Sequence, residues 1–257
     1  MVELVMLGSG SRGNCALVRT ERSALLVDAG LSARQIARRL DAVGQDPRRI
    51  DAILVTHEHR DHLCGVATFA RKFHTLVLGN EATLAAAGPV VEGLPVERFV
   101  NGESLQVGAF VVTPFPVPHD AADPVGLVLE AEGVRIGYAT DLGHVTHLVA
   151  ARLAGCAALV IETNHDRDML MDGPYPWVVK QRVASRIGHL SNDHAAASLP
   201  ALAAGGTSHV VLAHISETNN DPGLARVTVE TALSAAGLAG VDVHVARQDR
   251  PIDGVPL

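Results

Sequence analysis

Residues 56–62 read Thr-His-Glu-His-Arg-Asp-His, directly after the apolar run Ala-Ile-Leu-Val at 52–55. Four of these residues are types that bind metal ions: His57, His59, Asp61 and His62. In an extended segment, side chains two residues apart point the same way, so His57 and His59 can hold one ion together. If a helix begins near Asp61, then Asp61 and His62 face a second ion. A polar loop that is rich in histidine by chance is the alternative, but this density of ligands after a buried strand favours a metal site.

Further ligands are expected just past other predicted strands, where sites are commonly built. His119, Asp141 and His214 each follow such a strand. Asp141 is the natural bridge between two ions, because a carboxylate has two oxygens. Imidazole and carboxylate ligands suit Zn, Mn or Fe, and paired metals are a usual hydrolytic arrangement. The sequence therefore predicts two divalent metal ions per chain.

Short apolar runs alternate with helical patterns along the whole chain. The expected strands are at 2–7, 15–19, 24–28, 51–56, 76–79, 104–107, 110–116, 126–130, 135–139, 157–162 and 209–213. The expected helices are at 32–43, 61–73, 145–154, 194–204 and 224–236. Without a linker or an internal repeat, this order predicts one α/β domain over residues 1–257, with helices covering sheets.

Composition gives weaker information. The chain has 257 residues, 47% of them hydrophobic, and a net charge of −7, so it lacks the strongly basic character typical of many nucleic-acid-binding proteins. Three widely spaced cysteines do not suggest a disulfide framework. The first residues have no signal-peptide pattern, and no window is apolar enough to span a membrane. We therefore expect a cytoplasmic protein with no membrane partner.

The ligand series from His57 to His214 resembles, in order, that of the metallo-β-lactamase superfamily. Residues 7–14 resemble the opening strand and turn of that superfamily, and Asp28-Ala29-Gly30 its second motif, whose Asp supports the metal loop from behind. The resemblance implies a four-layer αββα sandwich, an α/β (α+β) fold, with the metals at one edge of its two sheets.

Within the superfamily, several motifs are similar to those of the YycJ/WalJ group, which is related to ribonuclease Z. They lie at residues 9–14, 56–62, 162–166, 188–192 and 212–220. This resemblance implies a metal-dependent nuclease with 5′-to-3′ exonuclease action on DNA, and it favours DNA over RNA as the partner. The fold alone hosts many chemistries, so the substrate is the less specific part of the prediction.

The resemblance also implies catalytic roles. Asp61 is expected to orient the attacking hydroxide while it ligates a metal ion. His189, in a loop similar to one of ribonuclease Z, is expected to donate the proton to the leaving sugar oxygen. Glu162 matches the family's partner of that histidine, and a carboxylate partner would raise the pKa of His189 and fix its tautomer.

Basic and polar residues near these motifs are candidates for substrate contact. Lys180, Arg182 and Arg186 lie on a predicted helical stretch that leads into His189, with Arg182 and Arg186 as an i,i+4 pair. A solvated basic face is the alternative. The other candidates are Arg12 in the glycine-rich turn, Ser191 and His165, and the last of these could instead hold its own loop.

Two competing functions stay open at this point. The first is another hydrolase of the same fold, such as a small cyclic phosphodiesterase or a thioesterase. A lactamase is disfavoured, because this chain has Asp141 where such enzymes commonly use Cys. A thioesterase typically carries a helical domain after the last ligand, whereas only residues 215–257 follow His214. The second is a metal-holding module that binds a partner without turnover.

Overall fold

The computed structural model describes all 257 residues, which form two compact units. The first unit comprises residues 1–116, 121–134 and 247–257, and the second comprises residues 117–120 and 135–246. Compact units occur within single domains as well as between domains, so one domain over residues 1–257 stays a prediction. None of the helices combines the length and the apolar character needed to cross a bilayer.

The first unit is built around a seven-stranded sheet in the order β14-β1-β2-β3-β4-β5-β6. Its elements are β1 (Glu3–Gly8), β2 (Cys15–Arg19), β3 (Ala24–Val27), α1 (Ala33–Ala42), β4 (Ala52–Leu54), α2 (Arg60–Leu63), α3 (Val66–Phe73), β5 (Leu76–Gly79), α4 (Glu81–Ala87), β6 (Val96–Arg98), β7 (Leu105–Val107), β8 (Phe110–Pro116), β9 (Val125–Ala131) and β14 (Val255–Pro256). Strands β1 to β3 pair antiparallel, and β3 to β6 pair parallel. The strands β7, β8 and β9 pair antiparallel as a meander and are not part of the β14-to-β6 sheet.

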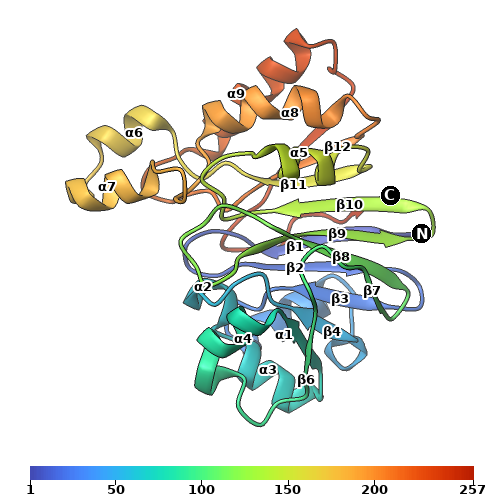
Figure 1. Cartoon of the computed structure of the whole chain (residues 1–257). Helices are drawn as coiled ribbons and strands as arrows, with labels where there is room; N and C mark the ends of the chain where they lie inside the picture. The colour runs from blue at the N-terminus through green and yellow to red at the C-terminus, as the bar shows by residue number, and fades with distance from the viewer. The chain divides into compact units, whose positions relative to one another are not determined.

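One apolar core lies between this sheet and the helices α1 and α3, which cover one of its faces (Figure 1). Leu26 and Ile53 contribute to it from the strands, and Ile36, Leu40 and Phe69 from the helices. The Ser32 hydroxyl accepts a hydrogen bond from Gln35 N and so caps α1, as its position before an amphipathic run predicts. This packing fixes the carboxyl end of β4, from which the metal loop departs.

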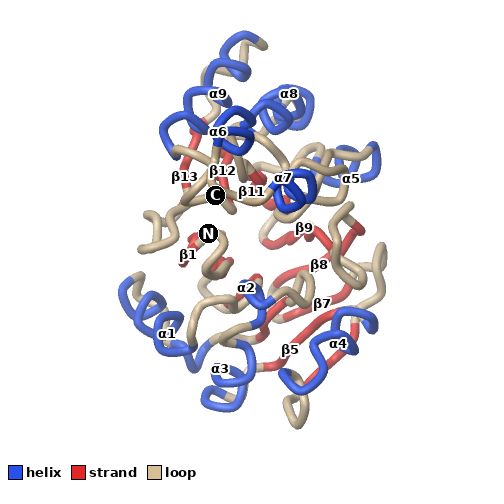
Figure 2. The backbone as a smooth tube through the Cα atoms, turned by 90° about the vertical axis from the view of Figure 1, so that its left-hand side faces the viewer, coloured by secondary structure: helices blue, strands red, loops and turns tan.

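The second unit contains four parallel strands in the order β13-β12-β11-β10, of which β13, β12 and β11 are labelled in Figure 2. Its elements are β10 (Val134–Ala139), α5 (His147–Leu153), β11 (Ala158–Glu162), α6 (Arg167–Asp172), α7 (Trp177–Val183), α8 (Asn192–Ala203), β12 (His209–Ala213), α9 (Pro222–Ala235) and β13 (Asp242–Val245). Helices α8 and α9 pack against each other, while α6 and α7 stand apart from them (Figure 1). Parallel strands bring their carboxyl ends to one edge, which positions the residues that follow them.

Most predicted elements are confirmed, and four predicted strands match β2, β5, β8 and β12 to the residue. The single helix expected over 61–73 is wrong, because the chain breaks into α2 and α3 around Gly65. The Gly65 N–H donates to Ala29 O at 2.7 Å, and a Cβ at Gly65 would lie 2.1 Å from Leu31 O. This close approach to the 29–31 segment replaces the hydrogen bond that would have continued the helix.

Candidate metal centre and active site

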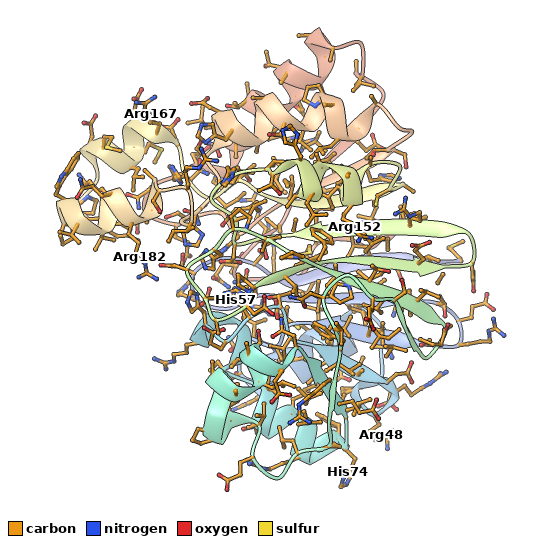
Figure 3. All side chains as sticks on the ribbon, viewed as in Figure 1. Arg48, His57, His74, Arg152, Arg167 and Arg182 are labelled. Carbon is orange, nitrogen blue, oxygen red and sulfur yellow. The ribbon has the colours of Figure 1, made fainter.

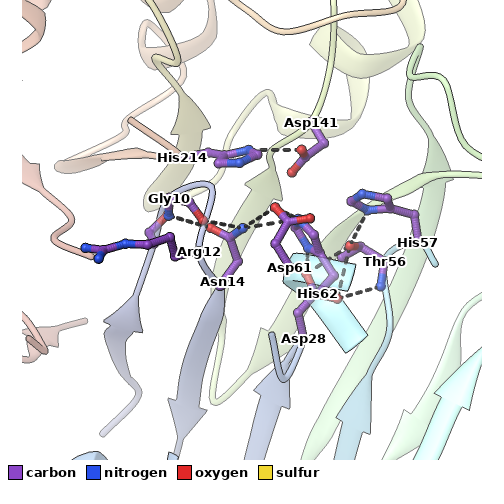
Figure 4. Close-up of polar contacts among 12 residues, drawn as sticks. Gly10, Arg12, Asn14, Asp28, Thr56, His57, Asp61, His62, Asp141 and His214 are labelled. Atoms are coloured by element: carbon purple, nitrogen blue, oxygen red, sulfur yellow. Dashed lines mark hydrogen bonds and ion pairs between the residues drawn. The ribbon is translucent and has the colours of Figure 1, made fainter. Parts of the chain in front are cut away.

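In the first unit, the loop after β4 carries the four predicted ligands of residues 57–62, of which His57, Asp61 and His62 are labelled in Figure 4. His57 and His62 are buried, and their ring centroids lie 4.1 Å apart. The His59 ring meets His57 edge-on at 4.6 Å, and Asp61 Oδ2 lies 3.4 Å from His62 Nε2. Three imidazoles and a carboxylate therefore converge within one short loop, as the sequence predicts for this unit.

The Asp28 carboxylate, fully buried at the end of β3, sets the tautomers of two of these histidines. Asp28 Oδ2 accepts from His62 Nδ1 at 2.7 Å, and Oδ1 accepts from Thr56 N at 2.9 Å. The Thr56 hydroxyl donates its one proton to Asp28, at 2.9 Å from Oδ2, and therefore accepts from His57 Nδ1 at 3.1 Å. Both rings are protonated at Nδ1, which leaves the Nε2 lone pairs for a metal ion.

Asn14 and Gly30 hold the same loop through its backbone. Asn14 N donates to Asp61 O at 2.8 Å, and the Asn14 amide nitrogen lies 3.2 Å from Asp61 Oδ2. At Gly30, a Cβ would lie 1.5 Å from Asp61 O, so only glycine fits there. The orienting roles of Asn14 and Thr56 were not predicted, although both residues stand inside the motifs that the sequence singles out.

In the second unit, Asp141, Glu162 and His214 come together at the carboxyl ends of β10, β11 and β12. His214 Nδ1 lies 2.9 Å from Asp141 Oδ1 and 3.1 Å from Glu162 Oε1. Asp141 and His214 have positive φ angles of 55° and 52°. Non-glycine residues held in that region cost about 1–3 kcal/mol each, and such strain is concentrated at functional sites.

His119, the third predicted ligand of this unit, is buried near the same group. Its Nε2 lies 3.8 Å from Asp141 Oδ1, and its Nδ1 lies 3.0 Å from the carbonyl oxygen of Gly188. A carbonyl can only accept, so His119 is protonated at Nδ1 and presents the Nε2 lone pair. Burial lowers the pKa of His119, against the opposing charge of Asp141.

His189 and Glu162 form the pair that the resemblance implied. His189 Nδ1 donates to Glu162 Oε1 at 2.8 Å, while Glu162 Oε2 accepts from the backbone N–H groups of Leu142 and Leu190, each at 3.0 Å. Burial alone would raise the pKa of Glu162, but the charge and hydrogen bond of His189 outweigh it and hold that pKa at about 2. Burial would lower the pKa of His189, and Glu162 reverses this effect, so the pKa of His189 is raised.

The donor chemistry of both units fits divalent metal ions. In the first unit, the Asp28 carboxylate holds His62 Nδ1 directly and His57 Nδ1 through the Thr56 hydroxyl. A carboxylate that orients a histidine in this way is the usual support for a metal ligand. In the second unit, one potential ligand atom from each of Asp141, Glu162, His189 and His214 lies within 4.8 Å of the others. Imidazole and carboxylate are ligands of Zn, Mn and Fe.

The predicted basic helix is partly corrected. Lys180 is buried and donates to the carbonyl oxygen of Met171, so its ammonium group is already used inside the unit. Helix α7 ends at Val183, before Arg186, so the i,i+4 pairing of Arg182 with Arg186 is wrong. Arg182 is exposed on α7 and bonds the Asp120 carboxylate (Figure 3). Arg186 Nη2 lies 3.0 Å from His144 Nε2.

Ser191 and His165 lie in the buried loops behind Glu162 and His189. The Ser191 hydroxyl accepts from His194 N at 3.2 Å and so caps α8. His165 O accepts from Asn192 N at 2.9 Å, and the residue is 3% exposed. Burial lowers the pKa of His165 to about 4, so the ring is neutral at physiological pH. The Ser191 hydroxyl therefore has a structural contact, whereas His165 Nδ1 has no hydrogen-bond partner, and contact of either residue with substrate stays a prediction.

The chain belongs to the β-lactamase superfamily, whose domain description, Beta-lactamase superfamily domain, matches residues 24–215. It has the metallo-β-lactamase fold, and it is a hydrolase of that fold. The structure of the metallo-β-lactamase fold protein YhfI from Bacillus subtilis superimposes with a TM-score of 0.76 over 98% of this chain and 99% of that chain, at 16% identity. The predicted fold class is thereby confirmed.

Two proteins with similar sequences indicate the group within the superfamily that this chain resembles in its motifs. The chain is 36% identical to exodeoxyribonuclease YycJ of Bacillus anthracis, over 90% of this chain and 89% of that protein. It is 35% identical to exodeoxyribonuclease WalJ of Streptococcus pneumoniae, over 93% of this chain and 91% of that protein. The resemblance to the YycJ/WalJ group is thereby confirmed.

Proposed function

We propose that this hydrolase is a binuclear, metal-dependent phosphodiesterase that acts on nucleic acid, as a 5′-to-3′ DNA exonuclease. Its similarity to two exodeoxyribonucleases over nine tenths of the chain supports this substrate class. The observation that carries the chemistry is the His189–Glu162 hydrogen bond of 2.8 Å beside Asp141 and His214. It provides a proton donor at a cluster of potential metal ligands, which phosphodiester hydrolysis needs when the sugar oxygen leaves.

Each of the two units supplies proposed metal ligands, and the family membership of the chain supports these assignments. They are His57, His59, Asp61 and His62 from the first unit, and His119, Asp141 and His214 from the second. Two divalent ions, Zn or Mn with Fe as a further candidate, would supply the activated nucleophile and neutralise charge that develops on the phosphoryl group. Asp61, through its carboxylate, would also orient the attacking group.

The roles of His189 and Glu162 follow from their hydrogen bonds. Because His189 Nδ1–H is bound to Glu162, the second nitrogen, Nε2, is the one that can exchange a proton with substrate. The two backbone N–H groups on Glu162 Oε2 hold the carboxylate still, so the imidazole is oriented before substrate arrives. In this arrangement His189 Nε2 donates the proton to the leaving sugar oxygen, and Glu162 stabilises the charged imidazole.

The basic residues that would contact phosphates are the exposed ones. Arg12, Arg182 and Arg186 are exposed. Lys180 donates to a backbone carbonyl, so we no longer propose that it contacts phosphate. We also propose a cytoplasmic location, which the three free cysteines support because disulfides are rare in that compartment.

The test is hydrolysis of 5′-labelled duplex DNA, single-stranded DNA and a structured RNA by protein loaded with Zn or Mn. We expect release of nucleotides from duplex DNA, with loss of activity in Asp61→Ala. A fall of about 100-fold or more in kcat is expected for His189→Gln, with nearly unchanged substrate KM. The control is His147→Gln, which changes an exposed histidine of the same unit on α5.

The outcomes separate the competing functions. Cleavage of RNA alone would contradict DNA as the substrate. Turnover of a cyclic phosphodiester or thioester without cleavage of any polymer would contradict the nuclease. Two bound metal ions without hydrolysis of any of these substrates would favour a non-catalytic binding module.

A further inference from the structure

A pocket of about 300 Å³ in the first unit has three arginines in its wall. Arg38 and Arg39 come from α1, and Arg12 comes from the turn between β1 and β2. Gln248 and Asp249, from the C-terminal segment of the same unit, also line the pocket. We refer to this hollow as the arginine pocket.

Arg39 is a buried cation that forms no ion pair. It is 4% exposed, and its guanidinium donates only to carbonyl oxygens: Nη1 to Leu7 at 2.7 Å, and Nη2 to Gln248 at 3.1 Å and Asp249 at 2.9 Å. Its Nε has no hydrogen-bond partner. Gly8 makes room for this placement, because a Cβ there would lie 2.3 Å from Nη1. A buried charge is normally paired, so this one is available to a ligand of opposite charge.

The neighbouring charges increase the positive potential of the arginine pocket. Arg38 is exposed and forms no hydrogen bond or ion pair. Burial lowers the pKa of Arg39, the charge of Arg38 lowers it further, and the charge of Asp249 acts in the opposite direction. Asp249 is the one acidic residue in the wall, but it meets Arg39 through its carbonyl oxygen and not through its carboxylate. The pocket therefore has three cationic groups and a single carboxylate.

The arginine pocket lies next to the metal loop of the same unit. A second hollow, of about 350 Å³, is lined by Arg12, Arg60 and Asp61, so Arg12 belongs to both walls. The Arg12 side chain extends away from Asn14, the residue that holds the Asp61 backbone (Figure 4). A strand whose reacting phosphate lies at Asp61 would thus have further phosphates within reach of Arg12 and Arg38.

We propose that the arginine pocket is a phosphate subsite, which binds a phosphate group of the nucleic-acid strand away from the bond that is cleaved. The inference rests on the proposed function for the identity of the strand. Arg12 and Arg38, which are exposed, would contact the phosphate, and guanidinium groups match its oxygens with two parallel hydrogen bonds. Arg39 beneath them would contribute a fixed positive charge. The phosphate is either a backbone diester or the 5′-terminal monoester.

The test measures affinity for DNA that cannot be cleaved, so that binding is separated from hydrolysis. Full-length, metal-loaded protein is titrated with duplex DNA whose terminal linkages are phosphorothioates, with either a 5′-phosphate or a 5′-hydroxyl. We expect Arg38→Ala to weaken binding about tenfold and to lower the slope of log K against log salt by about 1. Alanine is a good helix former, so α1 should remain folded.

The matched control is Arg34→Ala, which removes the same charge from an exposed position of α1 that is not in the wall of the pocket. An equal loss for both DNA ends in Arg38→Ala supports a backbone phosphate. A loss confined to the 5′-phosphorylated DNA supports the terminal phosphate. Unchanged affinity in Arg38→Ala, or an equal loss in Arg34→Ala, overturns the subsite.

A second measurement addresses free phosphate as the ligand. If inorganic phosphate raises the Tm of the wild-type protein but not of Arg38→Ala, while both bind DNA equally, the pocket binds a free ion and its assignment to the strand is overturned. Failure of the proposed function would give a different result. The protein would not hydrolyse ordinary DNA, but its binding to DNA would still depend on Arg38. Hydrolysis without any dependence of binding on Arg38 would contradict the subsite alone.

Discussion

The most direct test of the metal-loop geometry is Asp28→Asn. The substitution keeps the size of the side chain, and asparagine tolerates the positive φ of 59° at this position, so backbone strain is not added. What changes is the number of acceptor oxygens. Asp28 uses both of its oxygens, one for Thr56 N and the other for His62 Nδ1, and asparagine offers only one.

The size of the effect follows from these contacts. One buried donor loses its acceptor and faces an amide N–H, which costs about 1–3 kcal/mol in the free energy of unfolding. If the His62 ring turns, its Nε2 lone pair is no longer held toward a metal ion. If the Thr56 hydroxyl no longer donates to residue 28, the Nε2 lone pair of His57 is no longer held either. Loss of such support typically lowers metal affinity about 10- to 100-fold.

Two measurements check this prediction: urea unfolding of the metal-free protein and competition for Zn with a chelator of known affinity. The control is Asp46→Asn, which changes a partly exposed carboxylate that caps a short 3-10 turn at Pro47–Arg49. We expect that control to keep its metal affinity within about twofold, as most surface changes do. A metal affinity for Asp28→Asn equal to that of the control would refute the argument that Asp28 sets the ligand tautomers.

Three further predictions concern other parts of the first and second units. Gly30→Ala should destabilise the protein by about 3 kcal/mol or more in urea unfolding and abolish metal binding, because its Cβ would meet Asp61 O at 1.5 Å; normal metal binding would contradict the close approach. Burial lowers the pKa of His244, and the charge of His209 lowers it further. The unfolded chain therefore binds this proton more readily than the folded chain does, and the metal-free protein should lose stability as the pH falls below about 6.5. Urea midpoints at about pH 7.5 and pH 5.5 should differ less in His244→Gln, and an unchanged difference would exclude this histidine as the cause. A disulfide reagent should modify one thiol per folded chain, Cys64, because the other two cysteines are buried; rapid modification of a second thiol would contradict that burial.

The first-unit part of the site could be predicted because its chemistry is local in sequence. His57, His59, Asp61 and His62 follow one strand, so their convergence depends on a single loop and on the end of β4. The break between α2 and α3 could not be predicted, because it depends on contacts of Gly65 with residues 29 and 31, which no local pattern encodes. Long-range backbone approaches of this kind are invisible to periodicity.

The second-unit part is distributed over the chain, and each of its residues alone resembles an ordinary loop residue. Asp141, Glu162 and His214 are neighbours only because β10, β11 and β12 are parallel and adjacent, which brings their carboxyl ends to one edge. The order of these strands could not be obtained from the sequence. The family resemblance identified these residues as site residues, which local patterns could not do. The burial of Lys180 and the end of α7 before Arg186 depend on packing, so the sequence pattern did not predict them.

Overall charge says little about a local surface. The net charge of −7 gives no indication of nucleic-acid binding, yet Arg12, Arg38 and Arg39 line one hollow of the first unit. On α1, Arg39 lies on the same face as Ile36 and Leu40, which are fully buried. Burial of an arginine at such a position costs free energy unless a ligand or carbonyl oxygens accept its hydrogen bonds. Carbonyl acceptors bind its Nη1 and Nη2 atoms, but Nε has no partner and no ion pair balances the charge. A phosphate strand would balance that charge, so the same acidic protein can bind an acidic polymer through one small, locally positive surface.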